Sequence, residues 1–280
     1  MHERDALARL ATLLPEAGDD AAVVDGLVVT TDMLHQSTDF PAGTTRYTSG
    51  WRAVGASLSD VAAMGGEAVA AVAVYGAPTF EGDAIESFVE GARDVCEAVG
   101  GTYVGGDLDG HEEFTVASTA VGRADDPVYR SGATAGEAVC VTGTLGRSAA
   151  ALRLFRNGDS DRANELFRFE PRVAAGRVLA GRATSMIDSS DGLARSLHQV
   201  AAASECGFAL ESPLPLPPAS ASPVCASLCP SVASSSAGCT SLSFAGSEAP
   251  PPRVSDRPAN SLSTSVSKRE RTRREFSSTT

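Results

Sequence analysis

The sequence predicts a mixed α/β (α+β) protein, and three observations point to that class. Apolar runs of strand length alternate along the chain with stretches whose apolar residues recur every three or four positions, as on one face of a helix. Pairs of glycine follow these helical stretches, where a left-handed residue commonly ends a helix. With 280 residues, 42% of them hydrophobic, the chain is long enough for two modest domains with their own cores.

The first part of the chain contains the clearest periodic segments. The run at 68–75 is apolar throughout, which is typical of a strand buried on both faces. Thr44 or Thr45 and Asp83 are good N-cap residues for the two helical stretches that follow them. We therefore expect strands at 27–32, 68–75, about 102–105 and 113–122, and helices from Thr44 or Thr45 to about 64 and from Asp83 to about 99.

A loop rich in Asp, Pro and Gly at 123–136 predicts a domain boundary. We place an N-terminal domain at 1–126 and the beginning of a C-terminal α/β domain at 127–210. The expected elements of the second domain are a strand at 138–144, helices at 147–156 and 170–182, and a strand, turn and helix over 185–203.

The composition changes abruptly after about residue 211. Serine and proline dominate 211–280, and no helical or strand period persists there. Such a segment cannot bury enough apolar surface to offset its chain entropy, so we expect a disordered tail. Because the change directly follows a well-formed helical pattern, our hypothesis is that a shifted reading frame produced it.

Charge and hydropathy exclude some classes of partner. The formal net charge is −12, which argues against a surface that binds nucleic acid. No apolar run approaches the length needed to cross a bilayer, so no membrane association is expected. The N-terminus has no signal-peptide pattern, and we expect a cytoplasmic protein.

One polar pattern recurs: an aspartate beside Gly, Ser or Thr at the end of an apolar run. Small neighbours allow a phosphate and its metal ions to approach the backbone, and carboxylates are the ligands that Mg²⁺ prefers. Taken singly, each aspartate could equally cap a helix or belong to a solvated turn, and spacing alone does not show that they converge. The aspartates in this pattern are Asp19, Asp20, Asp32, Asp60, Asp107, Asp188 and Asp191.

The stretches AGDDAAVV, VVTTDMLHQSTDF, GASLSDVAAMGGEA, YVGGDLDG, VTGTLGRSAA and MIDSSDGLARSL together identify a resemblance. Over about residues 2–211 the chain closely resembles the thiamine-monophosphate kinases, which belong to the aminoimidazole ribonucleotide synthetase-like ATP-binding superfamily. The resemblance implies a two-domain fold whose N-terminal sheet pairs across a homodimer. It also implies Mg²⁺-dependent transfer of a phosphoryl group from ATP to thiamine monophosphate, which gives thiamine diphosphate.

The same resemblance assigns residues to roles. No protein nucleophile or general base is expected, because the acceptor is itself an ionised phosphate. Asp39 lies at a substrate-binding position where many relatives have histidine. The implied ATP contacts are Gly106, Asp107, Arg130 and Ser190, and the implied magnesium positions are Asp20, Thr30, Thr31, Asp32, Asp60, Asp107, Asp188 and Asp191.

Two alternatives remain open. The chain could be another synthetase of the same superfamily, although the RSGA and VTGTLGRSAA stretches favour the kinases. It could also be a truncated, inactive dimer that binds Mg²⁺ and ATP. That second alternative rests on the tail, because relatives continue past residue 211 with segments that hold the thiamine moiety, so we expect the C-terminal domain to be incomplete.

Overall fold

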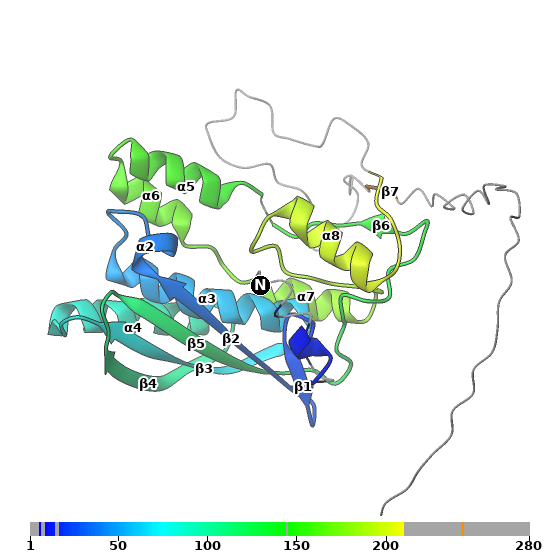
Figure 1. Cartoon of the computed structure of the whole chain (residues 1–280), viewed down its shortest axis with the longest axis horizontal. Coiled ribbons are helices and arrows are strands. Elements are labelled where there is room, and N and C mark those ends of the chain that lie inside the picture. The colour runs from blue at the N-terminus through cyan, green and yellow to red at the C-terminus, as the bar shows by residue number, and fades with distance from the viewer. Residues whose placement is uncertain (1–5, 7–8, 15–16, 144, 210–241, 244–280) are drawn as a thin grey trace, which may run out of the picture. The chain divides into compact units, whose positions relative to one another are not determined.

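The computed structural model describes residues 6, 9–14, 17–143, 145–209 and 242–243 (Figure 1). These residues belong to one compact unit, and the boundary at 126/127 stays a prediction. The predicted disordered tail at 211–280 lies outside the described residues except for 242–243, which form β7 (Leu242–Ser243) and pair with β6 (Ala138–Val139).

A five-stranded sheet organises the N-terminal part, with the strand order β1-β2-β5-β3-β4. Neighbouring strands are antiparallel except for β3 and β4, which are parallel and joined through helix α4. Each strand predicted from apolar runs in this part is present, and β1 is an additional short one. The bounds are β1 (Ala22–Val24), β2 (Leu27–His35), β3 (Glu67–Ala77), β4 (Thr102–Gly110) and β5 (Thr115–Arg123).

Helices α3 (Arg46–Ala63) and α4 (Gly82–Ala98) pack on one face of this sheet and on each other (Figure 1). The predicted cap of α3 is confirmed, because the Thr45 hydroxyl accepts a hydrogen bond from the Thr48 amide at 3.1 Å. The two helix backbones touch where Gly50 meets Gly91. A Cβ at Gly50 would lie 2.1 Å from the Phe88 carbonyl oxygen, so a larger residue there would force the helices apart.

The core between sheet and helices is built from side chains that follow the two periodicities expected from the sequence. Val54, Leu58 and Val61 recur along α3, and Phe88 and Val95 along α4, all with 1% exposure or less. This layer holds α3 firmly against β2 and β5.

Most of the remaining elements of the described chain are helices, and α6 and α7 contact α3. Helices α5 and α6 form a hairpin around Phe155 and Phe167, whose rings meet edge to face. Helix α7 lies against α3, where a Cβ at Gly176 would be 2.1 Å from the Ala62 carbonyl oxygen. The bounds are α2 (Gln36–Asp39), α5 (Arg147–Arg156), α6 (Ser160–Phe167), α7 (Val173–Ala180) and α8 (Leu193–Ala203).

Four details differ from the expectations. Helix α4 begins at Gly82, with Glu81 as its N-cap, so Asp83 lies in the first turn instead of capping it. No strand is assigned at 185–188, and β6 is two residues long instead of spanning 138–144. Strand β3 is buried on one face only within this chain: residues facing the helices are buried, whereas Val69, Val72 and Val74 are 37–43% exposed.

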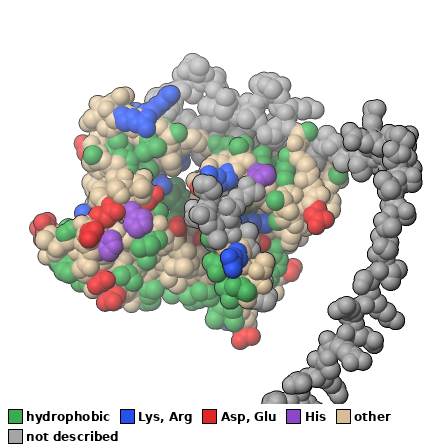
Figure 2. Space-filling view, in the orientation of Figure 1, with side chains coloured by type: hydrophobic (Ala, Val, Ile, Leu, Met, Phe, Trp, Pro, Cys, Tyr) green, Lys and Arg blue, Asp and Glu red, His purple; other side chains and the backbone are tan. Residues whose placement is uncertain are grey.

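The opposite face of the sheet carries exposed apolar side chains. Hydrophobic side chains are gathered over the strands in the space-filling view (Figure 2). Because a half-buried antiparallel sheet normally has polar residues on its solvent face, this composition is unusual for an isolated chain. We call this surface the apolar sheet face; its members are Val29, Met33, Val69, Val72, Val74 and Val104.

Candidate metal and phosphate site

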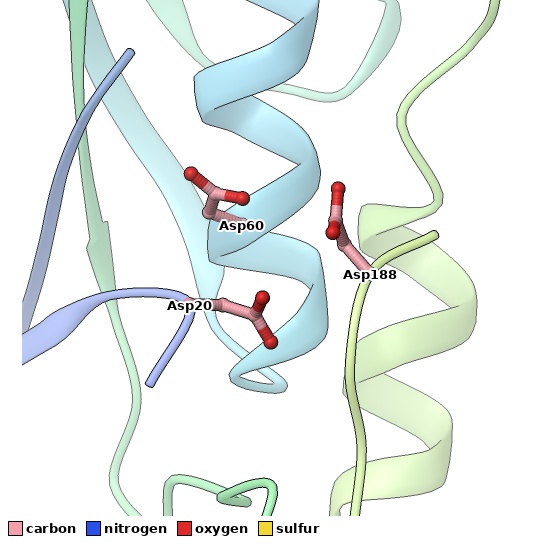
Figure 3. Close-up of side chains that lie close together, drawn as sticks. All are labelled: Asp20, Asp60 and Asp188. Atoms are coloured by element: carbon pink, nitrogen blue, oxygen red, sulfur yellow. The ribbon is translucent and has the colours of Figure 1, made fainter. Parts of the chain in front are cut away.

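Three aspartates from distant parts of the sequence converge at one end of α3 (Figure 3). Asp20 precedes β1, Asp60 lies in the last turn of α3, and Asp188 lies in the loop before α8. Each offers a carboxylate oxygen, and these oxygens lie within 4.8 Å of one another. Two ionised carboxylates at about 4 Å repel by roughly 4 kcal/mol at an effective dielectric constant of 20. The arrangement therefore calls for a cation or for bound protons.

Asp60 is the central member of this group. The Thr30 hydroxyl on β2 donates to Asp60 Oδ2 at 2.7 Å, which joins the helix to the sheet beside the carboxylate. Burial raises the pKa of Asp60 to about 8, and the nearby carboxylates of Asp188, Asp20 and Asp32 add to the rise, while the Thr30 hydrogen bond opposes it. A carboxylate with this pKa is easily neutralised, either by a proton or by a metal ion.

Asp20 is held by an arginine. Arg130 Nη2 donates to Asp20 Oδ1, whereas Asp20 Oδ2 is buried and has no hydrogen-bond partner. Burial raises the pKa of Asp20 to about 6, although the hydrogen bond and the charge of Arg130 lower it. An unpaired buried carboxylate oxygen is costly, so Asp20 Oδ2 marks a position where a ligand would be stabilised.

Asp188 is anchored by its own loop and by α3. The Ser190 amide donates to Asp188 Oδ1 at 3.4 Å, and Ser196 on α8 donates to the Asp188 carbonyl oxygen at 3.1 Å. Burial raises the pKa of Asp188, and hydrogen bonds from Ser190 and from Ser59 lower it. Because Ser59 adjoins Asp60, α3 helps to orient two members of the group.

The residues fit a hard divalent cation such as Mg²⁺. All donors are carboxylate oxygens, which is the ligand type that Mg²⁺ prefers, and one of these oxygens is buried without a partner. We refer to Asp20, Asp60 and Asp188 below as the carboxylate group.

Comparisons with known proteins place this chain in a family. Residues 18–124 match the family model "AIR synthase related protein, N-terminal domain". A thiamine-monophosphate kinase of Halobacterium salinarum is 66% identical over 212 residues, which cover 76% of this chain and 74% of that protein. The chain belongs to the thiamine-monophosphate kinase family. A second member, from Methanospirillum hungatei, is 46% identical, and the alignment covers 71% of this chain and 71% of that protein.

Solved structures of the thiamine-monophosphate kinase family share the fold. The structure titled "AaThiL complexed with AMPPCP and TMP" superposes with a TM-score of 0.68 at 28% sequence identity, over 73% of this chain and 71% of that one. The predicted fold class and the predicted family are thus confirmed.

Several other positions that the family resemblance implied lie near the carboxylate group. Burial raises the pKa of Asp32 on β2, and the charges of Asp188, Asp39 and Asp191 raise it further, so these acidic residues share one electrostatic environment. Asp191 is exposed and pairs with Arg195 Nη1 at 2.9 Å. Ser190 contributes its amide to Asp188, as described above.

Two of the implied positions have local partners of their own. The Thr31 side chain lies on the exposed side of β2 and donates to the Ser118 carbonyl oxygen at 2.9 Å. The Asp39 carboxylate accepts hydrogen bonds from the His35 amide at 2.8 Å and from the Thr38 hydroxyl at 2.7 Å, within the single turn of α2. Their metal and substrate roles stay predictions.

Gly106 and Asp107 lie apart from the carboxylate group. Gly106 is in register with Ala73, Ser118 and Asp32 across the sheet, so three strand spacings, about 14 Å, separate it from Asp32. Asp107 is exposed on the edge strand β4, and its carboxylate accepts a hydrogen bond from the Leu108 amide at 2.9 Å. Within one described chain, the fold does not bring Asp107 to Asp60.

Two residues of the site, Asp19 and Ser59, have no role assigned by the family resemblance. Asp19 accepts a hydrogen bond from the Arg130 amide at 2.9 Å through Oδ2, and its Oδ1 accepts one from the Asp20 amide at 3.0 Å. Ser59 bonds Asp188. The sequence offered one indication for both residues, because each directly precedes a predicted metal ligand.

Proposed function

We propose that this chain transfers the γ-phosphoryl group of ATP to thiamine monophosphate, giving thiamine diphosphate and ADP. A new bond forms between the γ-phosphorus and an oxygen of the acceptor phosphate, while the bond from the γ-phosphorus to the β,γ-bridging oxygen breaks. The observation that carries the proposal is the convergence of Asp20, Asp60 and Asp188 with one buried oxygen unpaired. The names of the relatives and the AMPPCP and TMP of the similar solved structure support the choice of substrates.

In this proposal the carboxylate group holds Mg²⁺, with Asp32 and Asp191 as further acidic residues at its margin. Bound Mg²⁺ would neutralise phosphate charge and align donor and acceptor. Thr30 and Ser59 orient Asp60 and Asp188, and Asp19 orients Arg130. Arg130 supplies a planar guanidinium, which suits phosphate oxygens.

The reaction asks for positioning more than for proton transfer. An acceptor phosphate is already ionised near neutral pH, so no side chain has to remove a proton from it. The roles of Gly106, Asp107 and Ser190 toward ATP and of Asp39 toward thiamine monophosphate are part of the same proposal.

We further propose that two copies of the chain pair through the apolar sheet face. Its exposed valines and Met33 give it enough apolar side chains to favour a self-complementary contact between two copies. Val72→Glu, on the central part of this face, should convert a dimer into a monomer in sedimentation experiments. Val178→Glu, the same change at an exposed position of α7, should leave the dimer intact. A monomeric unmutated protein would contradict the pairing.

Activity is tested by incubating the full chain with ATP, thiamine monophosphate and Mg²⁺ and separating the products by chromatography. Thiamine diphosphate should form in step with ADP, and Asp60→Asn should abolish it while circular dichroism shows a folded protein. The matched control is Asp161→Asn, an exposed carboxylate in the first turn of α6, which should retain activity. Turnover by Asp60→Asn at the unmutated rate would refute the metal assignment.

The same experiment separates the second candidate, an inactive nucleotide-binding protein. This candidate has one supporting observation: the alignment with the Halobacterium salinarum kinase covers 74% of that protein. Mg²⁺-dependent binding of ATP without any thiamine diphosphate would favour it over the kinase.

A further inference from the structure

Arg130 occupies an unusual position for a residue expected to bind a nucleotide. Its guanidinium is bonded to Asp20, a member of the carboxylate group, and its Nε lies 3.7 Å from Asp19 Oδ1. A metal ion would neutralise the negative charge of these carboxylates. The guanidinium of Arg130 already supplies a positive charge in part of the space that such an ion would occupy.

We propose that Arg130 is an internal counter-ion of the metal site: it holds Asp20 in the metal-free protein and transfers to the triphosphate when nucleotide binds. The release of Asp20 then strengthens metal binding, so nucleotide and metal ion bind cooperatively. This inference rests on the proposed function, because it takes the carboxylate group as the metal site and a triphosphate as the incoming anion.

The backbone of Arg130 is fixed, which confines the exchange to its side chain. Its amide donates to Asp19 Oδ2 at 2.9 Å, and its carbonyl oxygen accepts from the hydroxyls of Ser185 at 2.7 Å and Ser204 at 3.0 Å. The guanidinium can then change partner without moving the loop that carries it.

The guanidinium is also incompletely satisfied in its present position. Arg130 Nε is buried and has no hydrogen-bond partner, although its charge is shared between Asp19 and Asp20. A guanidinium has five donors in a planar fork, and a phosphate presents several oxygens that match it. A triphosphate would therefore satisfy more of these donors than Asp20 does.

A purely structural role for Arg130 makes the opposite prediction for metal binding. If Arg130 only orients Asp20, its removal should weaken metal binding, because one ligand would be misplaced. If Arg130 competes with the metal ion, its removal should strengthen metal binding in the absence of nucleotide. The sign of the change distinguishes the two roles.

The test measures the affinity of Mn²⁺ alone for the full chain without nucleotide, by electron paramagnetic resonance of free Mn²⁺. Arg130→Gln should bind Mn²⁺ about tenfold more tightly than the unmutated protein, a typical size for a coupling between two sites. Arg130→Lys, which keeps the charge, should stay close to the unmutated protein and guards against a folding defect in the glutamine variant. The matched control is Arg93→Gln on α4, because Arg93 also lies near two carboxylates, Asp94 and Glu97, but is exposed.

Unchanged or weaker Mn²⁺ binding by Arg130→Gln would overturn the proposal. So would tighter binding by Arg93→Gln of the same size, since that would show a general effect of charge. If Asp60→Asn binds Mn²⁺ as well as the unmutated protein, the metal site of the proposed function fails as well; if only the Arg130 result fails, the metal site stands without the counter-ion.

A reciprocal experiment uses AMPPCP in the presence of a chelator. Asp20→Asn frees Arg130, so it should bind metal-free AMPPCP more tightly than Asp188→Asn, which removes the same charge but leaves the Arg130–Asp20 pair in place. A difference of about fivefold or more is expected. Equal affinities of the two variants would contradict the exchange of Arg130 between Asp20 and phosphate.

Discussion

Asp60 lies at the end of a helix that is packed on both sides, whereas Asp107 lies on the exposed edge strand of the sheet. Both follow small residues at the end of an apolar run, yet their surroundings differ. The carboxylates of Asp20 and Asp188 and the buried Thr30 hydroxyl meet Asp60, and its pKa is raised to about 8. Asp107 is exposed and bonds to its own backbone neighbour. The comparison shows that a cluster of carboxylates forms where distant segments of the chain converge, and that the local sequence pattern alone does not produce one.

The largest expected effect compares these two aspartates directly. Asp60→Asn should weaken Mn²⁺ binding without nucleotide by roughly 100-fold, because it removes one of the three carboxylates that would hold the ion together. Asp107→Asn should change it by less than about threefold. Titration calorimetry with Mn²⁺ measures both, and an equal loss in the two variants would remove the distinction between the regions.

A second prediction concerns the glycine beside Asp107. Gly106→Ala should destabilise the protein by about 2 kcal/mol, since the new Cβ would lie 1.7 Å from the Ala73 carbonyl oxygen on β3. Gly110→Ala on the same strand meets open space and is the control. Urea unfolding measures both variants. If Gly106→Ala is as stable as Gly110→Ala, the close approach of β3 is not what requires glycine there.

A third prediction uses the pH dependence of the metal-free protein. Asp60 has a folded pKa of about 8 and Asp20 one of about 6, both above their ordinary value of 3.8, so the folded state binds more protons than the unfolded state. Stability from these groups is fully present below pH 3.8 and is lost as the pH rises through 6 and 8. Between pH 6 and pH 8 the loss should be about 2–3 kcal/mol, most of it from Asp60, or roughly 5–10 °C in Tm.

Thermal unfolding in a chelating buffer measures this slope, and Asp60→Asn should flatten it. The exposed control Asp161→Asn should retain it. A Tm that rises from pH 6 to pH 8 in the unmutated metal-free protein would contradict the burial of the carboxylate group.

The smallest expected effect is at Thr30. Thr30→Val removes the hydrogen bond to Asp60 Oδ2 and should raise the Asp60 pKa further, because that bond favours the ionised form. Since a metal ion competes with the proton, Mn²⁺ binding at pH 7 should weaken by about threefold, and the pH of half-maximal binding should rise. Thr30→Ser keeps the hydroxyl and should behave as the unmutated protein; a loss in both variants would point to packing instead.

Local patterns were sufficient to predict most of the elements. The helical stripe and the Thr45 cap predict α3 to within a residue or two, because periodicity and capping are local properties. Helices α2 and α6 were missed: α2 is one turn long, and α6 is a short helix whose apolar residues pack mainly against α5. The expected double-sided burial of β3 failed because the other face of the sheet is open within one chain.

The site could be predicted only in part. The pattern of small residues and aspartates selected Asp20, Asp60 and Asp188 together with Asp107, and nothing local distinguishes them. Asp107 is separated from the other three because the strand order places β4 at the edge of the sheet. The packing of α7 on α3 helps to bring the segment before α8, which carries Asp188, to Asp60. The pairing of Arg130 with Asp20 joins residues 110 positions apart and has no local sequence signal.

Crystals grown with Mn²⁺ and without nucleotide would test the central claim most directly, through the anomalous scattering of the metal ion. An anomalous peak in contact with carboxylate oxygens of Asp20, Asp60 and Asp188 is the predicted result. A peak at Asp107 and none at these three residues would contradict the account.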